Sequence, residues 1–287
     1  MTFRSVPAIR AIPIGRVIAA SVLAVSLALT AGCARNRNKP KADQAYVARD
    51  VETLYSIARD TLEKGDYKLA ALMFDEVERQ HPYSVWARRA QLMSAFANYA
   101  SRQYPEAIIT AQRFLSLHPG NRDAPYAYYI IALSYYEQIA DVARDQKITQ
   151  QALTALQELT RRYPDSRYAA DARLKIDLVN DHLAGKELDI GRFYARNRQW
   201  IAAAIRYRNV IDQYQTTSHV PEALFRLVEA NLALGLQDEA LRNAAVLSAN
   251  YPGSKWYERA YALMRQHAPN ATVDGGPKSG AAAPGGA

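Results

Sequence analysis

Apolar residues recur at spacings of three and four positions along most of the chain, without the sustained two-residue alternation of a half-buried strand. This spacing predicts amphipathic helices, five of them about fourteen residues long, a common helix length in globular proteins. They begin near Tyr67, Tyr104, Thr149, Trp200 and Gln237. In each of them an alanine is followed, seven positions later, by a bulky apolar residue. The alanine lets a neighbouring helix approach closely, and the bulky residue fills the space between the two helices.

These five helices align as copies of one repeat. The alanines are Ala70, Ala107, Ala152, Ala203 and Ala240, and the bulky residues are Val77, Phe114, Leu159, Val210 and Leu247. Four copies have a proline twelve positions after the alanine, namely Pro82, Pro119, Pro164 and Pro252. Proline cannot continue a helix because it lacks the backbone N–H. Each proline is followed two positions later by a residue suited to capping the next helix: Ser84, Asn121, Ser166 and Ser254.

Successive alanines are separated by 37, 45, 51 and 37 residues, and the pattern resembles the tetratricopeptide repeat, whose period is about 34 residues. Gly65 and Gly235 supply turns between the two helices of a pair. The extra residues predict an insertion from Ala140 to Lys147 and a long helix that includes residues 171–196. The predicted fold is therefore all-α, a superhelical stack of five tetratricopeptide-like helix–turn–helix repeats.

The first 32 residues have the layout of a secretory signal. Three arginines, the last of them Arg16, come before an apolar core from Val17 to Leu29. This core is shorter than the about 20 apolar residues that span a bilayer. The small residues Ala31 and Gly32 follow it.

Cys33, the single cysteine of the chain, stands directly after this segment. The arrangement resembles the lipobox of bacterial lipoproteins, although Thr30 stands where leucine is usual. The resemblance implies cleavage before Cys33 and an S-diacylglycerol and an N-acyl chain on it. Because Ala34 and not aspartate follows, it also implies sorting to the outer membrane. The alternative is an ordinary signal peptide with an incidental thiol.

Charge is concentrated at the N-terminus. The formal net charge is +8, of which residues 1–32 contribute three positive charges. Four more come from the tether behind the cysteine: Arg35, Arg37, Lys39 and Lys41. A nucleic-acid-binding protein carries its basic footprint on the folded domain, so the near-neutral remainder argues against that class.

The chain divides into four predicted parts. They are a signal peptide (residues 1–32), a lipidated basic tether (33–45), a repeat domain (46–268) and a disordered Gly/Ala/Pro tail (269–287). Within the domain, the repeats span about 46–82, 83–119, 120–164, 165–215 and 216–252, and a capping helix spans 254–267.

No enzyme motif is present. The five histidines are scattered, and the sequence has no HExxH, glycine-rich phosphate loop or G-x-S-x-G. Asp177 and Asp181 share a helix face, which a solvated acidic surface explains. We therefore expect neither catalysis nor a cofactor or metal.

A lipobox followed by five such repeats resembles the BamD family of outer-membrane lipoproteins from the β-barrel assembly machinery. The resemblance runs from about Tyr46 to Met264 and is carried by stretches such as "LYSIARDTLEKGDYKLAALMFDEVERQHPYS" and "RRYPDSRYAADAR". It implies a non-enzymatic scaffold, lipid-anchored on the periplasmic face of the outer membrane. The C-terminal repeats would dock the periplasmic domains of the barrel-forming subunit, and the N-terminal repeats would recruit unfolded outer-membrane proteins. Accessory lipoproteins are further candidate partners.

A second class of protein shares these features. A tetratricopeptide lipoprotein that acts as a secretin pilotin or a cell-wall-synthesis adaptor has the same anchor and scaffold, and composition does not separate the two.

A candidate docking face lies between Asp189 and Asp212, where the sequence has five arginines and no acid: Arg192, Arg196, Arg198, Arg206 and Arg208. Arginine suits such a contact because its planar fork binds a carboxylate bidentately. The alternatives are a solvated basic face, or pairing with acids between Asp171 and Asp189. The family resemblance implies that Arg206, six residues after Trp200, pairs with a glutamate of the barrel-forming subunit.

The stretch "YAYYIIALSYYEQ" offers a candidate peptide groove. Tyr126, Tyr129 and Tyr136 would present aromatic rings to an extended peptide. Aromatic residues at helical spacing also form the core within a repeat, which is the alternative for these three.

Overall fold

The computed structural model describes residues 50–142 and 144–267, so the signal peptide, Cys33, the tether and the tail lie outside the described residues. Within these two ranges the chain forms eleven helices and no strand, which confirms the all-α prediction. Five helices are the first members of pairs: α2 (Val51–Glu63), α4 (Val85–Ala100), α6 (Ala124–Tyr136), α8 (Arg167–Arg196) and α10 (Val220–Ala233). Their second members are α3 (Tyr67–Gln80), α5 (Tyr104–Leu117), α7 (Lys147–Arg162), α9 (Trp200–Gln213) and α11 (Gln237–Asn250), and α12 (Lys255–His267) follows.

The second helices match the repeat pattern closely. Four begin at the predicted residue, and α7 begins at Lys147, two residues before the predicted Thr149. All five alanines and all five bulky residues of the repeat have 0% exposure. These two columns therefore form the contact surface of the second helices, as their spacing predicts.

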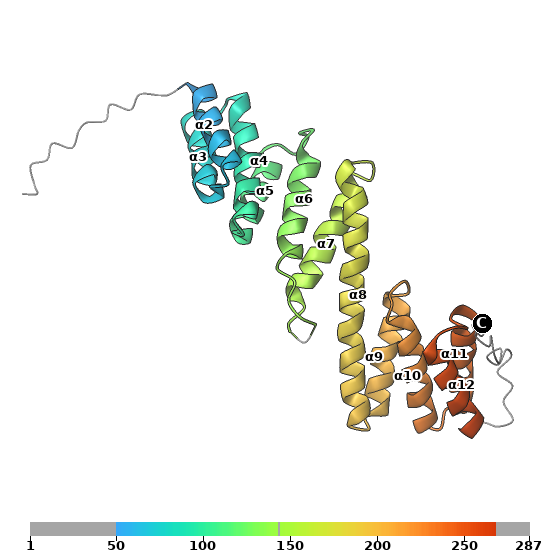
Figure 1. Cartoon of the computed structure of the whole chain (residues 1–287). Coiled ribbons are helices and arrows are strands. Elements are labelled where there is room, and N and C mark those ends of the chain that lie inside the picture. The colour runs from blue at the N-terminus through green and yellow to red at the C-terminus, as the bar shows by residue number, and fades with distance from the viewer. Residues whose placement is uncertain (1–49, 143, 268–287) are drawn as a thin grey trace, which may run out of the picture. The chain divides into compact units, whose positions relative to one another are not determined.

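Each helix packs against the next along the chain, and the first helices α2, α4, α6 and α8 also contact one another in that order (Figure 1). Phe74 and Val77 from α3, for example, pack with Ala90 and Ala97 from α4 in one core cluster. A single pair of helices cannot bury its apolar faces alone, so the stack of neighbours supplies the core.

The turn within a pair uses a left-handed residue at the same place in four repeats. Gly65 and Gly235 have φ of 83° and 78°, and the equivalent Arg102 and Arg198 have φ of 62° and 58°. Glycine adopts this conformation without the steric penalty that a Cβ imposes. The two arginines therefore occupy strained backbone positions.

Two of the four predicted helix caps form as expected. The hydroxyls of Ser84 and Ser254 accept hydrogen bonds from the backbone N–H groups of Ala87 and Tyr257, at 2.9 and 3.1 Å. Ser166 precedes α8, but its hydroxyl has no partner among the described residues.

The fourth candidate cap, Asn121, lies two residues before the N-cap position of α6. Its side-chain oxygen accepts from the N–H of Asp123 at 2.8 Å, so it shapes the turn that leads into α6. The N-cap position of α6 is Asp123 itself, which makes no side-chain cap bond.

Helix α8 has 30 residues and contains the whole predicted long helix. Its first half packs on α7 through Ala172 and Val179, and its second half packs on α9 through Ala184 and Leu188. Asp181, whose side chain is 40% exposed, also accepts hydrogen bonds from the backbone N–H and hydroxyl of Ser218, at 2.9 and 2.7 Å. It thereby fixes the turn before α10 to α8.

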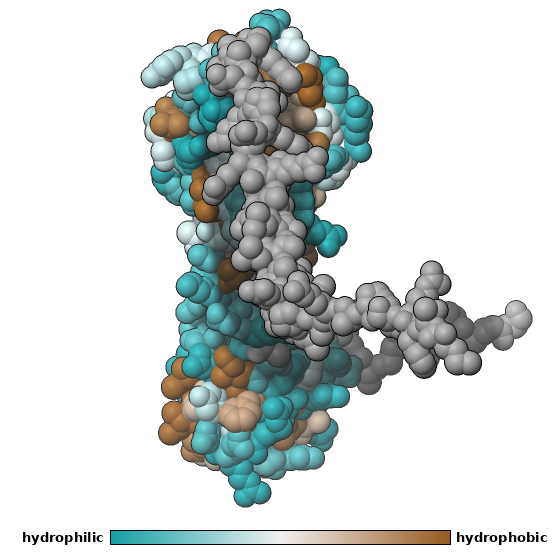
Figure 2. Space-filling model, turned by 90° about the vertical axis from the view of Figure 1, so that its left-hand side faces the viewer, coloured by the Kyte–Doolittle hydropathy of each residue, from teal (hydrophilic) through white to brown (hydrophobic). Residues whose placement is uncertain are grey.

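No helix in the described part of the chain is both long and apolar enough to cross a membrane. On the face shown in Figure 2, hydrophobic side chains form separate patches among hydrophilic ones. Scattered exposed apolar residues of this kind are ordinary on a folded surface.

Candidate docking surfaces

Arg192 on α8 makes two ion pairs within the chain. Its Nε and Nη2 donate to the two carboxylate oxygens of Glu222 on α10, at 3.0 and 2.7 Å, and its Nη1 donates to Asp189 at 2.7 Å. Glu222 is only 9% exposed, so the bidentate guanidinium satisfies a buried carboxylate. Arg192 thus holds α8 to α10.

Arg206 on α9 also has an internal partner. Its Nη1 donates to both carboxylate oxygens of Glu187 on α8, at 3.3 and 3.2 Å, and Asn209 donates to the same group at 3.3 Å. For Arg192 and Arg206, the structure therefore shows the pairing with nearby acids that the sequence left as one alternative.

The remaining three arginines of the predicted face are exposed. The side chains of Arg196 and Arg198 make no hydrogen bond or ion pair to any residue that the structure describes. Arg208 lies close enough to Glu239 on α11 to help lower the pKa of that carboxyl, after the larger effect of the hydrogen bond from Arg242. Of these three exposed arginines, Arg196 lines a pocket.

This pocket, of about 390 Å³, lies between α8, α9 and α10. Arg192, Arg196 and Arg226 contribute three guanidinium groups to its lining, against the single carboxylate of Glu229. Glu229 already accepts from Arg226 at 2.8 Å. Arg192 is paired with Glu222 and Asp189, and Arg226 with Glu222 and Glu229, so Arg196 is the one guanidinium of the lining without an ion pair to a described residue.

Tyr207, in the same pocket, adds a hydrogen-bond donor. The residue is 1% exposed, and its hydroxyl has no hydrogen-bond partner within the described ranges. Burial raises the pKa of the phenol to about 12, so it stays protonated at neutral pH. Arg196 and Tyr207 thus line one pocket, and each side chain has a donor without a partner among the described residues. Tyr207 was not singled out from the sequence because its position resembles an ordinary core aromatic.

The three tyrosines predicted to line a peptide groove are half-buried and contact α8, and Tyr136 also lines a pocket of about 470 Å³ beside that helix. Tyr126 and Tyr129 contact the ring of Tyr168, with centroids 5.5 and 4.9 Å away, and the Tyr129 hydroxyl donates to Asp171 at 2.7 Å. The ammonium of Lys175 lies 5.1 Å from the ring centroid of Tyr136. All three rings thus contribute to the contact between α6 and α8.

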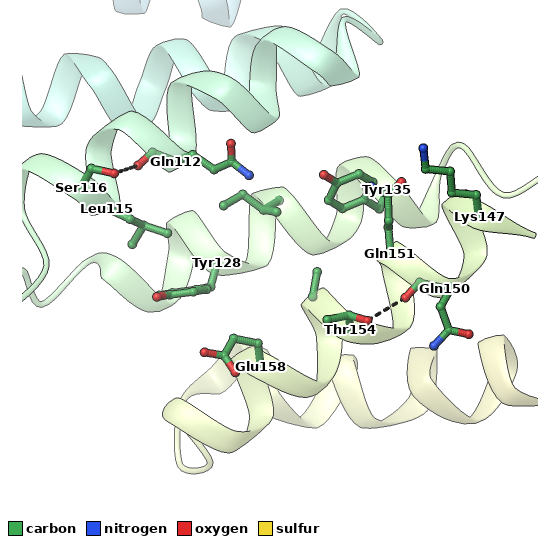
Figure 3. A pocket seen from close by; sticks show the side chains of 12 residues that line it. Gln112, Leu115, Ser116, Tyr128, Tyr135, Lys147, Gln150, Gln151, Thr154 and Glu158 are labelled. Carbon is green, nitrogen blue, oxygen red and sulfur yellow. Dashed lines mark hydrogen bonds between the residues drawn. The ribbon is translucent and has the colours of Figure 1, made fainter. Parts of the chain in front are cut away.

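A pocket larger than the one beside Arg196 lies on another face of α6. It has a volume of about 870 Å³, and α5, α6 and α7 line it (Figure 3). Tyr128, Ile131 and Tyr135 form its floor, and their spacing of three and four residues places them on one face of the helix. This spacing could indicate the pocket from the sequence. However, tyrosines occur on all sides of α6, so the pattern does not single out one face of the helix.

The paired helices define the class of this protein as a tetratricopeptide-type helical-repeat protein. The family model described as "Outer membrane lipoprotein", YfiO, matches residues 47–247. The chain belongs to the YfiO family of outer membrane lipoproteins.

Named relatives support this assignment. The chain is 54% identical over 250 residues to the outer membrane protein assembly factor BamD of Caulobacter vibrioides, covering 87% of this chain and 80% of the relative. It is 44% identical over 247 residues to the BamD of Rickettsia prowazekii, covering 86% and 96%. Among solved structures, the tetratricopeptide protein TTC0263 of Thermus thermophilus is 19% identical, with a TM-score of 0.35 over 75% of this chain and 99% of that one.

Proposed function

We propose that this lipoprotein is a non-enzymatic assembly factor for outer-membrane proteins and acts by docking other proteins on its helix surfaces. Two relatives that match over more than four-fifths of this chain carry the name outer membrane protein assembly factor. The observation that carries the docking role is the pocket between α8, α9 and α10, where Arg196 and Tyr207 have free donors. Such a site binds a partner and breaks no covalent bond.

In this proposal, Arg196 is the principal contact, and Arg198 and Arg208 extend the positive surface beside it. Arg192 and Arg206 position the helices through Glu222 and Glu187. The partner is the barrel-forming subunit of the assembly machinery, which presents a carboxylate from its periplasmic domains. Unfolded outer-membrane proteins are the substrates that the complex receives.

Co-purification tests this function. The protein is purified from envelopes solubilised in detergent, and the accompanying chains are identified by mass spectrometry. A large β-barrel protein with periplasmic domains should dominate. A secretin or a cell-wall synthase in its place would show that the protein is a pilotin or a cell-wall adaptor.

The membrane attachment is proposed to be the lipid on Cys33. Each buried methylene contributes about 0.8 kcal/mol, so several acyl chains together hold the protein firmly. Cys33→Ser should block both the lipid transfer and the cleavage, so the variant should keep residues 1–32 and carry no acyl chain, whereas the wild-type N-terminal peptide should carry the mass of three acyl chains. An unmodified N-terminus at another position would instead indicate an ordinary signal peptide.

A further inference from the structure

The loop between α3 and α4 exposes apolar side chains to solvent. Tyr83 in this loop is 98% exposed, and Val85, the first residue of α4, is 55% exposed. Leu117, the last residue of α5, is 58% exposed. In the other three copies of the repeat that keep the proline, the residue directly after it is glycine or aspartate. The exposed tyrosine is therefore a feature of the first repeat and not of the repeat pattern.

A basic pocket of about 360 Å³ adjoins this loop, and Val85 is part of its lining. Arg88 and Arg89 from α4 and Arg122 from the loop before α6 also line it, against the single carboxylate of Asp123. Arg122 and Asp123 lie 3.8 Å apart with side chains 86% and 50% exposed, which makes a weak pair. Arg88 and Arg89 form no ion pair with a residue in the described part of the chain. The first turn of α4 contains no acid either, so the positive end of the helix dipole adds to this charge.

The exposed loop lies at the end of the first repeat where the tether joins the domain. Helices α2 and α3 run in opposite directions from the turn at Gly65, so the start of α2 is beside the end of α3. The ring of Tyr55 on α2 accordingly lies against the ring of Trp86 at the start of α4, with centroids 4.8 Å apart. Asp50 is 17 positions after Cys33, a length of chain that spans at most about 60 Å. A lipid on Cys33 therefore keeps this end of the domain within reach of the bilayer surface.

We propose that this end of the first two repeats contacts the bilayer surface, where the arginine pocket binds the phosphate of an anionic phospholipid and Tyr83 lies among the headgroups. The proposal rests on the lipid anchor at Cys33 proposed above. Tyrosine is enriched at membrane–water interfaces because its ring is apolar and its hydroxyl is polar. Guanidinium groups suit the headgroup because they bind phosphate oxygens bidentately. Val85 and Leu117 add apolar surface beside them.

The charge of the tether favours an anionic membrane over other occupants of the pocket. Residues 33–49 contain five basic residues and one acid, Asp43, and two further acids, Asp50 and Glu52, stand at the start of α2. A basic segment next to a lipid anchor is attracted to anionic lipids. The anchor also holds the bilayer within reach, so headgroups have a high effective concentration at the pocket, which a free anion or a separate protein does not have.

Fluorescence quenching by lipids tests the contact on the full-length lipoprotein. Cys33 carries the lipid in this proposal, so Gly120→Cys introduces the one free thiol, which takes an environment-sensitive dye. Gly120 is exposed in the loop beside the pocket, and a Cβ there meets no heavy atom within 4 Å. In phosphatidylcholine vesicles with about one-quarter phosphatidylglycerol, nitroxide-labelled phospholipid should quench this dye about threefold more than in pure phosphatidylcholine vesicles. Equal quenching in the two kinds of vesicle would overturn the proposal.

A dye at the opposite end of the same repeat is the matched control. Lys64 is exposed at the C-cap of α2, and the 13 residues of that helix place it about 20 Å from the start of α2. The dye on Lys64→Cys should stay in water and be quenched about threefold less than the dye at position 120 in the same anionic vesicles. Equal quenching at the two positions would show that the domain lies on the bilayer without a preferred end, which contradicts the proposal.

Variants in the Gly120→Cys background locate the site. Arg88→Glu should reduce quenching in the anionic vesicles about threefold, because repulsion replaces attraction. Tyr83→Ser should reduce it about twofold through loss of the interfacial ring. Lys68→Glu on α3 makes the same kind of charge change at an exposed position outside the pocket and should leave quenching unchanged. Circular dichroism checks that all variants keep their helical content. Unchanged quenching with Arg88→Glu would show that the pocket holds no headgroup.

The anchor, the docking pocket and the lipid contact are measured separately. The mass of the N-terminal peptide shows the acyl chains on Cys33 before vesicles are prepared, and recovery of the barrel-forming partner is measured in detergent. Failure of the lipid contact therefore leaves the proposed anchor and assembly function to their own tests. A dye at position 120 that stays in water in vesicles, and is shielded only when the co-purified partner is added, would identify a protein contact and overturn the proposal.

Discussion

The ring of Tyr207 lies directly against the backbone of Gly191. A Cβ added at Gly191 would lie 2.4 Å from Cε1 of Tyr207, closer than real Cβ atoms approach other atoms. The absence of a side chain at Gly191 therefore lets α9 pack closely on α8. This contact sets the position of the Tyr207 hydroxyl in the pocket that Arg196 opens onto.

Gly191→Ala should lower the free energy of unfolding by about 2 kcal/mol, because the added methyl group overpacks the helix contact. In an unobstructed helix the same change stabilises by about 1 kcal/mol, so the sign of the effect tests the close approach. Urea denaturation followed by circular dichroism measures it.

Gly185→Ala is the comparison on the same helix. There the Cβ would meet Nε2 of His219 at 3.1 Å, at the edge of a side chain that can move, so the loss should be smaller. A gain in stability for Gly191→Ala would contradict the close contact with Tyr207.

Tyr207→Phe should stabilise the isolated protein by about 1 kcal/mol, because it removes a buried hydroxyl that has no partner among the described residues. The same change should weaken docking of the partner, since the hydroxyl is a proposed donor to its carboxylate. Denaturation and co-purification of the same variant measure the two effects. A variant that loses stability and docks normally would show that the hydroxyl has a structural role only.

Stability should fall as the pH rises from about 10 to 12. Burial raises the pKa of both Tyr207 and Tyr126 to about 12, from the ordinary value of 10.0. The unfolded chain then releases these protons at a lower pH than the folded chain does, so deprotonation favours unfolding. Tyr207→Phe should reduce the slope of the urea midpoint against pH in this window. The same slope in both proteins would contradict the raised pKa of Tyr207.

Gly65→Ala should cost about 1 kcal/mol of stability through its backbone alone. Its φ is +83°, and a Cβ there would meet no heavy atom within 4 Å, so no clash contributes. Gly253→Ala is the matched control, because its Cβ is equally unobstructed and its φ lies outside the left-handed range. Thermal melts of the two variants compare the effects, and equal losses would show that φ is not the cause.

Much of the fold could be predicted because each repeat meets the same local constraints. A buried alanine such as Ala70 and a proline such as Pro82 recur at fixed spacing, so each copy confirms the others. The longer distance between the alanines of the third and fourth repeats also indicated the long helix α8, because the extra residues had to lie within one repeat. Helix caps were less predictable. Ser166 occupies the N-cap position of α8, but its side chain makes no capping hydrogen bond.

The site could be predicted only in part. The five arginines share one basic stretch, but their partners come from distant segments: Glu222 lies 30 positions after Arg192 and meets it only because α9 packs against both α8 and α10. The unused hydroxyl of Tyr207 likewise depends on packing. Tyrosines occur on every side of α6, so the sequence alone does not show which face of this helix stays open. The packing of α5, α7 and α8 around it decides this.

The central claim is that the C-terminal helices dock a protein partner through the pocket that Arg196 opens onto, and charge reversal at Arg196 tests it most directly. Arg196 is exposed and has no ion pair with a described residue, so Arg196→Glu should leave helical content and melting temperature unchanged. Arg88→Glu on α4 is the matched control, at another exposed arginine. Recovery of the barrel-forming partner from solubilised envelopes should fall about tenfold for Arg196→Glu and stay at the wild-type level for Arg88→Glu. Full recovery of the partner with Arg196→Glu would contradict the account.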